Sequence, residues 1–217
     1  MYSKIDIVLV GGGGHCKVVI SILNKIGKYN IVGISDTKEK LGQKILGIPI
    51  KYTDDQLEEL FEKGIKHALV TLGSVGNPDH RIRLFNMLKR IGFELPVVIS
   101  LDSVVDDTVD IGEGSVIMPG VIINADTKIG KNCIINTRAS IDHDCRISDH
   151  VHIAPGVTLS GLVIVGEGTH IGTGASVIQS VKIGKFSIIG AGSVVIKDVP
   201  NGMKVVGVPA KIRGKEE

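Results

Sequence analysis

Residues 129–153 read IGKNCIINTRASIDHDCRISDHVHI, and an aliphatic residue stands at every sixth position of this stretch. A small or β-branched residue follows four positions after each, as at Cys133 and Ala139. A globular sheet protein shows short runs of such spacing by chance, but not seventeen in succession. The period continues in both directions through Ile99, Val105, Ile111, Ile117, Ile123, Ile129, Ile135, Ile141, Ile147, Ile153, Leu159, Val165, Ile171, Val177, Ile183, Ile189 and Val195.

A six-residue period fits neither the 3.6-residue repeat of an α-helix nor the two-residue alternation of a strand. It is typical of a left-handed parallel β-helix, in which each hexad forms one flat side of a coil and three hexads close a triangle. We expect the aliphatic residues to point into the prism and to stack on coils about 4.8 Å apart. We expect positive φ angles at the glycines that follow them: Gly112, Gly130, Gly166, Gly172, Gly184 and Gly190.

Length and composition limit the alternatives. The chain of 217 residues allows two domains, and we place them at residues 1–97 and 98–217. Its net charge of +2 is spread along the sequence and forms no basic patch of the kind that binds nucleic acid. We expect no membrane-spanning segment and no signal peptide. The three cysteines suggest no disulfide framework, since Cys133 and Cys145 fall at inward positions, so we expect a cytoplasmic protein.

The N-terminal half predicts an α/β fold. A short apolar strand at residues 5–10 leads into the sequence GGGGHC at residues 11–16, an amphipathic helix that ends at Gly27, and a second strand at residues 31–34 followed by Asp36. We expect a helix at residues 54–63, a third strand at residues 67–71 and a third helix at residues 79–91. This is about half of a doubly wound Rossmann-like fold.

The glycine-rich loop is typical of nucleotide binding. Its glycines let the backbone approach a diphosphate, and the free N–H groups at the start of the helix can hold the phosphate oxygens. Asp36, at the end of the second strand, is placed to bind a ribose or a base. Cys16 stands where a third glycine is usual, so a tight turn that serves packing alone is the alternative.

His143 is the strongest catalytic candidate. It falls at an outward corner of the β-helix between Asp142 and Asp144, and a carboxylate beside an imidazole orients the ring and stabilises the imidazolium. The register also brings Asn136 and His152 onto adjacent sides of neighbouring coils, and we expect them to lie close to His143. Simple solubility is the alternative explanation for a surface histidine beside an aspartate.

Other histidines have different expected roles. His152 and His170 are eighteen residues apart, one full coil, and should therefore stack. We interpret His150 as a solvated side chain and leave His170 unassigned. A zinc site is the competing explanation for clustered histidines, but their spacing does not resemble that of the gamma carbonic anhydrases, so we expect no metal.

The segment after Pro200 contains the sequence GVPAK at residues 207–211, in which proline and glycine break the hexad rule. We expect it to leave the prism and to cover the exposed edge of the last coil. It can also present Lys211 and Arg213 to a phosphate.

Nearly the whole sequence resembles the two-domain hexapeptide acyltransferases that include the UDP-4-amino-sugar N-acetyltransferases of bacillosamine synthesis and the sialic acid O-acetyltransferases. The resemblance lies in the glycine-rich loop with His15, in Asp36, Gly73 and Asn136-Thr137, in IDHD at residues 141–144, in HIAPG at residues 152–156, and in the GVPAK tail.

The resemblance implies a homotrimer with acetyl-CoA between neighbouring β-helices, and direct transfer of the acetyl group with His143 as general base and Asp144 as its partner. Cys133 and Cys145 face inward and are not expected to form a covalent intermediate. Cofactor contacts are expected at His152, Gly161, Thr173, Ala191 and Lys211. Nucleotide-sugar contacts are expected at Gly13, Gly14, His15, Asp36, Gly73 and Asn136.

We therefore predict an acetyl-CoA-dependent N-acetyltransferase that acts on a nucleotide-linked amino sugar of the UDP-4-amino-4,6-dideoxy type. An O-acetyltransferase acting on a sugar or sialic acid is the nearest alternative. A non-catalytic scaffold that binds sugar nucleotides is another, although a scaffold has no need of His143 and Asp144.

Overall fold

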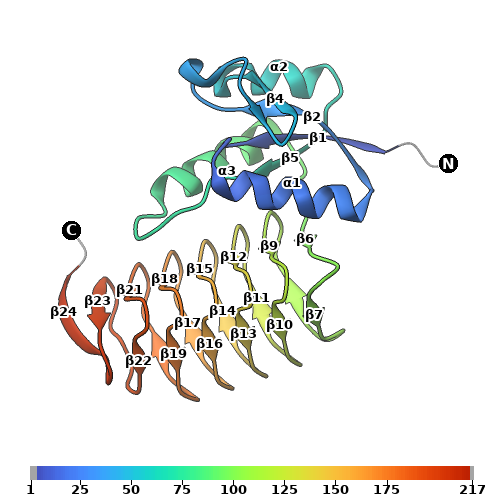
Figure 1. The fold of residues 1–217 in the computed structure, drawn as a ribbon. Coiled ribbons are helices and arrows are strands. Elements are labelled where there is room, and N and C mark those ends of the chain that lie inside the picture. Colours follow the sequence, from blue (N-terminus) through green and yellow to red (C-terminus); the bar gives the residue numbers. More distant parts are fainter. Residues whose placement is uncertain (1–3, 216–217) are drawn as a thin grey trace.

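The computed structural model describes residues 4–215 and places an α/β domain against one side of a long stack of short parallel strands (Figure 1). Within these residues, no helix combines the length and the apolar character needed to span a membrane.

The α/β domain is built on one five-stranded sheet in the order β3-β4-β2-β1-β5. Its strands are β1 (Ile5–Val10), β2 (Tyr29–Ser35), β3 (Lys44–Ile45), β4 (Ile48–Tyr52) and β5 (His67–Val70). β1, β2, β4 and β5 are parallel, as in a nucleotide-binding domain, whereas β3 and β4 form an antiparallel hairpin. Of these strands, the sequence predicts β1, β2 and β5 but not the hairpin of β3 and β4.

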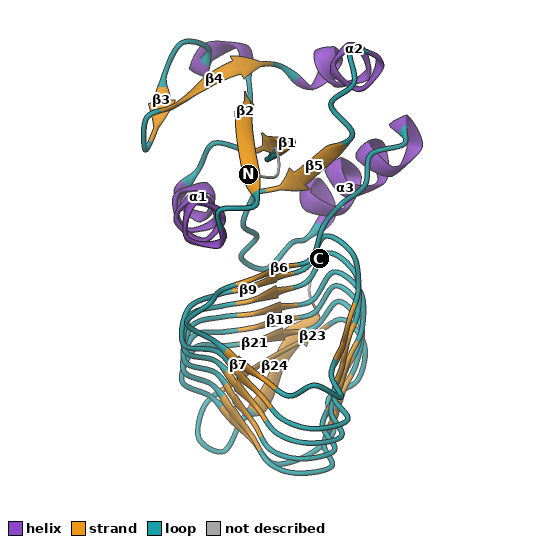
Figure 2. Cartoon of the chain, turned by 90° about the vertical axis from the view of Figure 1, so that its right-hand side faces the viewer, coloured by secondary structure: helices purple, strands orange, loops and turns teal. Residues whose placement is uncertain are grey.

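Helices cover both faces of this sheet (Figure 2). α1 (Gly14–Ile26) lies on one face and ends at Gly27, whose φ of 72° lets its N–H bond the Leu23 carbonyl. The apolar side of α1 joins a core that continues into the β-helix. α2 (Leu57–Glu62), preceded by a 3₁₀ turn at Asp54–Gln56, and α3 (Asp79–Ile91) pack on the other face. A second 3₁₀ turn spans Lys38–Lys40.

The hexads form a triangular β-helix, as the sequence predicts (Figure 2). Face 1 contains β6 (Val98–Ile99), β9 (Val116–Ile117), β12 (Ile134–Ile135), β15 (His152–Ile153), β18 (His170–Ile171), β21 (Ile188–Ile189), β23 (Met203–Val206) and β24 (Lys211–Lys215). Face 2 contains β7 (Val104–Val105), β10 (Ile122–Ile123), β13 (Ser140–Ile141), β16 (Thr158–Leu159), β19 (Ser176–Val177) and β22 (Val194–Val195). Face 3 contains β8 (Asp110–Ile111), β11 (Lys128–Ile129), β14 (Arg146–Ile147), β17 (Ile164–Val165) and β20 (Lys182–Ile183).

The interior of the β-helix contains the aliphatic residues that define the period. From Ile117 to Val195 each of them is buried, and Cys133 and Cys145 are fully buried at the small positions between them. The first coil differs, because Ile99 is 37% exposed and no coil precedes it to cover its side chain. Regular burial therefore begins at the second coil.

The glycines after the aliphatic residues are needed for a different reason than we expected. None of the six has a positive φ; a Cβ at Gly166, for example, would lie 2.6 Å from the backbone nitrogen of Lys185 in the next coil. Positive φ angles occur two residues further along, as at Gly168 and Gly174. The same conformation recurs every six residues from Gly114 to Gly192, and Asp144 adopts it with a φ of 59°.

The C-terminal tail does not leave the prism at once. β23 runs parallel to β21 and extends face 1, and β24 then returns antiparallel to β23. The tail therefore covers the edge of the last coil, as expected, by continuing one of its sheets.

Candidate functional site

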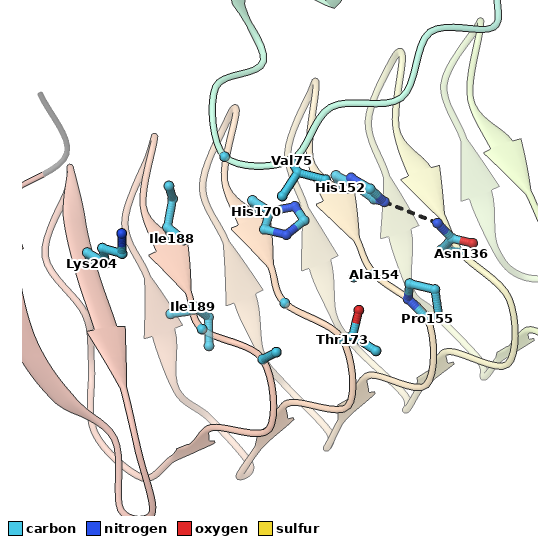
Figure 3. A pocket seen from close by; sticks show the side chains of 14 residues that line it. Val75, Asn136, His152, Ala154, Pro155, His170, Thr173, Ile188, Ile189 and Lys204 are labelled. Atoms are coloured by element: carbon cyan, nitrogen blue, oxygen red, sulfur yellow. Dashed lines mark hydrogen bonds between the residues drawn. The ribbon is translucent and has the colours of Figure 1, made fainter. Parts of the chain in front are cut away.

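A cavity of about 540 Å³ lies along the corner between faces 1 and 2, beneath the loop that joins β5 to α3. We call it cavity A (Figure 3). Its floor consists of residues from four stacked coils, and Val75 and Gly76 come from the loop. Lining residues from the β-helix include Asn136, His152, Pro155, His170, Thr173 and Ala191, with Lys204 from β23. Cavity A is thus the place where the two domains meet over a concave surface.

His152 is held on both sides within cavity A. Its Nδ1 donates to the carbonyl oxygen of Ser74, and its Nε2 accepts a hydrogen bond of 3.2 Å from Asn136 Nδ2 (Figure 3). The side chain is 7% exposed, and burial is the main cause that lowers its pKa to about 3. His152 is therefore a neutral imidazole with both ring nitrogens occupied.

His170 stacks on His152, as the eighteen-residue spacing predicts. The two residues pair in neighbouring strands, and their ring centroids are 4.9 Å apart in an edge-to-face arrangement. The rings lie on the flat strands of face 1 beside the corner, so they form part of the wall of cavity A.

His143 lies at the corner between β13 and β14, on the outside of the β-helix. Its Nδ1 donates to Asp144 Oδ2 at 2.8 Å, and this hydrogen bond is the main cause that raises the pKa of His143. Asp142 supports the turn by accepting from the His143 backbone N–H and from Asn124. The imidazole rests on Gly161 in the next coil, where a Cβ would lie 2.7 Å from Nε2. This arrangement can accept a proton at Nε2.

The expected meeting of His143 with Asn136 and His152 is not found within one chain. Cavity A opens at the corner between faces 1 and 2, whereas His143 lies at the corner between faces 2 and 3 and does not line the cavity. The prediction was wrong because residues in adjacent hexads of one coil point away from different corners of the triangle.

The expected cofactor residues fall into two groups. His152, Thr173 and Ala191 line cavity A. Gly161 instead supports the ring of His143, and Lys211 is exposed on β24 without lining the cavity.

A second cavity of about 250 Å³, cavity B, lies at the carboxyl ends of β1, β2 and β4, where α3 borders it. Asp36 lines it, and Asp36 Oδ2 accepts hydrogen bonds from the Gly12 N–H at 2.7 Å and from Lys40 Nζ at 2.9 Å. Desolvation opposes the charged carboxylate, but the hydrogen bonds from Lys40, Thr37 and Gly12 hold the pKa of Asp36 below its ordinary value. The glycine loop and Asp36 are thus tied together, as in a nucleotide-binding unit.

Gly13, Gly14 and His15 lie at the start of α1, beside cavity B rather than in it. Gly13 is the N-cap of α1, and no side chain of the described residues hydrogen-bonds the first N–H groups of the helix. A Cβ on Gly13 or Gly14 would meet nothing within 4 Å. Gly73 lies against His15, since an ideal Cβ built on Gly73 would be 3.5 Å from the Cβ of His15. The Nε2 of His15 is buried without a partner, and burial is the main cause that lowers the pKa of His15 to about 4.

Sequence reasoning missed Arg81, which joins the two domains. Arg81 is 1% exposed; its Nε donates to Ser74 Oγ at 3.2 Å, and its terminal nitrogens donate to the carbonyl oxygens of Asn132 and His150. Burial is the main cause that lowers its pKa to about 10. Arg81 precedes Leu84 and Leu88 on the apolar side of α3, and an arginine in that pattern was the available signal.

His150 is not the solvated side chain that we expected. It is 8% exposed, its ring packs edge-to-face on Phe85 of α3 with centroids 5.5 Å apart, and its Nδ1 lies 3.0 Å from Asn132 Nδ2. The α/β domain covers it, and the hexad register alone does not reveal that cover.

In the described part of the chain, no group of three or more histidine, cysteine, aspartate or glutamate side chains is arranged to hold a metal ion.

Two family models match the sequence. The PglD N-terminal domain matches residues 6–88, and the bacterial transferase hexapeptide model of six repeats matches residues 108–141 and 126–161. No curated protein sequence matches the chain.

Several solved structures share the complete two-domain fold. A histidine mutant of perosamine N-acetyltransferase from Caulobacter crescentus, in complex with CoA and GDP-perosamine, is 40% identical with a TM-score of 0.91, and the match covers 97% of each chain. The acetyltransferase domain of PglB from Neisseria gonorrhoeae, in complex with acetyl coenzyme A, is 35% identical with a TM-score of 0.89 over 97% of this chain and 100% of that one. WeeI from Acinetobacter baumannii is 31% identical with a TM-score of 0.84 over 96% and 100% of the two chains.

Proposed function

The chain belongs to the family of two-domain hexapeptide-repeat sugar acetyltransferases that includes the perosamine N-acetyltransferase and the PglB acetyltransferase domain, and we propose that it transfers the acetyl group of acetyl-CoA to the amine of a 4-amino sugar carried on a nucleoside diphosphate. The observation that carries this proposal is the exposed His143 with its Asp144 partner, since direct transfer to an amine requires a base outside the core.

The chemistry follows from the proton that the amine must lose. The sugar nitrogen attacks the thioester carbonyl carbon, and His143 Nε2 takes the proton as the tetrahedral intermediate forms. The intermediate then expels the CoA sulfur, which receives the proton from the imidazolium. Asp144 stabilises that imidazolium, in agreement with the raised pKa of His143. Cys133 and Cys145 are fully buried, so neither is a candidate for a covalent intermediate.

The nucleotide is assigned to cavity B and the acetyl-CoA to cavity A. Asp36 and the open start of α1 suit a ribose and a diphosphate. The Caulobacter enzyme was crystallised with CoA and GDP-perosamine. For the nucleobase there are two candidates: uracil, which the sequence resemblance favours, and guanine, which the GDP-perosamine complex favours.

We further propose a homotrimer in which His143 of one subunit faces cavity A of the next. Within a single chain the base and cavity A lie at different corners, so each active site needs two chains. The corner that bears His143 also exposes Leu162 (51%), Ile178 (43%) and Ile196 (42%). A row of exposed apolar side chains of this kind favours a subunit interface.

The test is acetyl transfer by His143→Ala. CoA release is followed with a thiol reagent over UDP- and GDP-linked 4-amino sugars and free sialic acid. We expect the wild type to use a nucleotide-linked amine, and the variant to keep its melting temperature and solution mass while kcat falls by about 10²–10⁴-fold. Near-wild-type turnover by the variant would exclude His143 as the base, and activity only on sialic acid would favour O-acetylation.

A further inference from the structure

His170 is a buried polar side chain of cavity A whose hydrogen-bonding capacity is unused. Its side chain is 7% exposed, and its Nδ1 is buried without any partner. In the described part of the chain, Nε2 has no hydrogen-bond partner either, yet it is not among the buried unpartnered atoms, so it retains access to the cavity. Figure 3 shows the ring on the cavity wall beside His152, in a cavity that Val75 also lines.

The neighbouring histidine does not offer the same capacity. Both ring nitrogens of His152 are already bonded, to Ser74 and to Asn136, and those bonds fix its proton on Nδ1. A ligand that is to receive a hydrogen bond from His152 must first displace one of these partners. His170 can bind a ligand without breaking any contact of the folded chain.

The protonation state of His170 determines what it can bind. Burial, and then the nearby positive charge of Arg81, lower its pKa, so the ring is neutral and has a single N–H. An orphaned N–H is rarer in folded proteins than an orphaned acceptor, which places the proton on Nε2 and the lone pair on the buried Nδ1. His170 therefore presents one N–H donor to cavity A, and a carbonyl oxygen is an acceptor that it can bind.

We propose that His170, rather than His152, holds the acyl-CoA by donating from Nε2 to a carbonyl oxygen of its acyl-pantetheine arm. The inference rests on the proposed function, which assigns acetyl-CoA to cavity A. His152 then acts as a positioning residue: locked between Ser74 and Asn136, it packs edge-to-face on the His170 ring at 4.9 Å and limits its rotation.

The test is His170→Phe, which keeps an aromatic ring packed against His152 and removes the Nε2 N–H donor. We expect the KM for acetyl-CoA to rise about 3- to 10-fold, while the KM for the nucleotide sugar and the pH profile stay unchanged. His170→Gln, which restores an N–H donor, should recover part of the loss. His67→Phe is the matched control, because His67 lies in β5 and lines neither cavity; it should leave both KM values unchanged.

Calorimetry with acetyl-CoA and with free CoA separates the two possible carbonyls. If His170→Phe weakens only acetyl-CoA, the acceptor is the thioester; if both ligands weaken equally, it is a pantetheine amide. An unchanged affinity for both ligands would overturn the proposal. Failure of the wild type itself to bind acetyl-CoA would instead refute the proposed function.

Histidine-selective ¹⁵N NMR of the wild type gives an answer even if the variants do not fold. Adding acetyl-CoA should slow solvent exchange of the His170 Nε2 proton and shift its resonance. A resonance that does not respond at saturating acetyl-CoA would contradict the assignment.

Discussion

At the scale of single residues, the pairing of His143 with Asp144 depends on the backbone of the corner. Asp144 has a φ of 59°, which brings its carboxylate beside the ring of the preceding residue. Neighbouring residues of an extended strand point in opposite directions, so the pair forms only because it lies at a corner. The sequence predicted the pair from adjacency, but only the structure shows the conformation that joins it.

Asp144→Asn tests the role of this carboxylate through pH dependence. Asp144 raises the pKa of His143, so its removal should lower that pKa and move the acid limb of kcat/KM to lower pH. The weaker base should also reduce the plateau rate by about tenfold. Asparagine tolerates the left-handed conformation, so the fold should persist. A pH–rate profile that does not move would show that Asp144 does not control the base.

At the scale of the coil, two kinds of glycine recur for different reasons. Gly166 makes room for the next coil, because a Cβ there would approach the Lys185 backbone at 2.6 Å. Gly174 instead supplies a φ of 67°, and a Cβ there would meet nothing within 4 Å. The first kind is limited by space and the second by backbone conformation.

Alanine substitutions separate these two causes. Gly166→Ala should lower the free energy of unfolding by about 3 kcal/mol, because backbone atoms of Gly184 and Lys185 in the next coil must move. Gly174→Ala should cost only about 1–2 kcal/mol, the strain of a left-handed alanine. Denaturant unfolding of both variants measures the difference. Equal losses, or a larger loss at Gly174, would contradict the assignment of Gly166 to coil spacing.

At the scale of the whole molecule, the contacts that join the two domains could not be predicted from the sequence. The repeating aliphatic positions predicted the β-helix, because each depends only on its neighbours one coil away. The bonds of Arg81 to Asn132 and His150 link residues 51 and 69 positions apart, and no period records them. The contribution of Val75 to the lining of cavity A could not be predicted for the same reason, since it depends on how the two domains pack together.

Arg81→Met measures the strength of this joint. The variant leaves the buried carbonyl oxygens of Asn132 and His150 without their donor, so we expect a loss of about 3 kcal/mol or more in unfolding free energy. Lys89→Met is the matched control from the same helix. Its exposed ion pair with Glu113, at 2.7 Å, also joins the two domains, and its loss should cost less than about 1 kcal/mol. Similar losses in both variants would show that Arg81 is not the main joint.

In the proposed trimer each active site is shared between subunits, with His143 from one chain and cavity A from its neighbour. The most direct measurement is acetyl transfer by mixed trimers of His143→Ala and Thr173→Trp subunits, the second of which has its cavity A filled. Each variant alone should be inactive, and random trimers from equal amounts should regain about a quarter of wild-type activity, because one interface in four combines an intact base with an intact cavity. A mixture that stays as inactive as its parents would contradict the shared site.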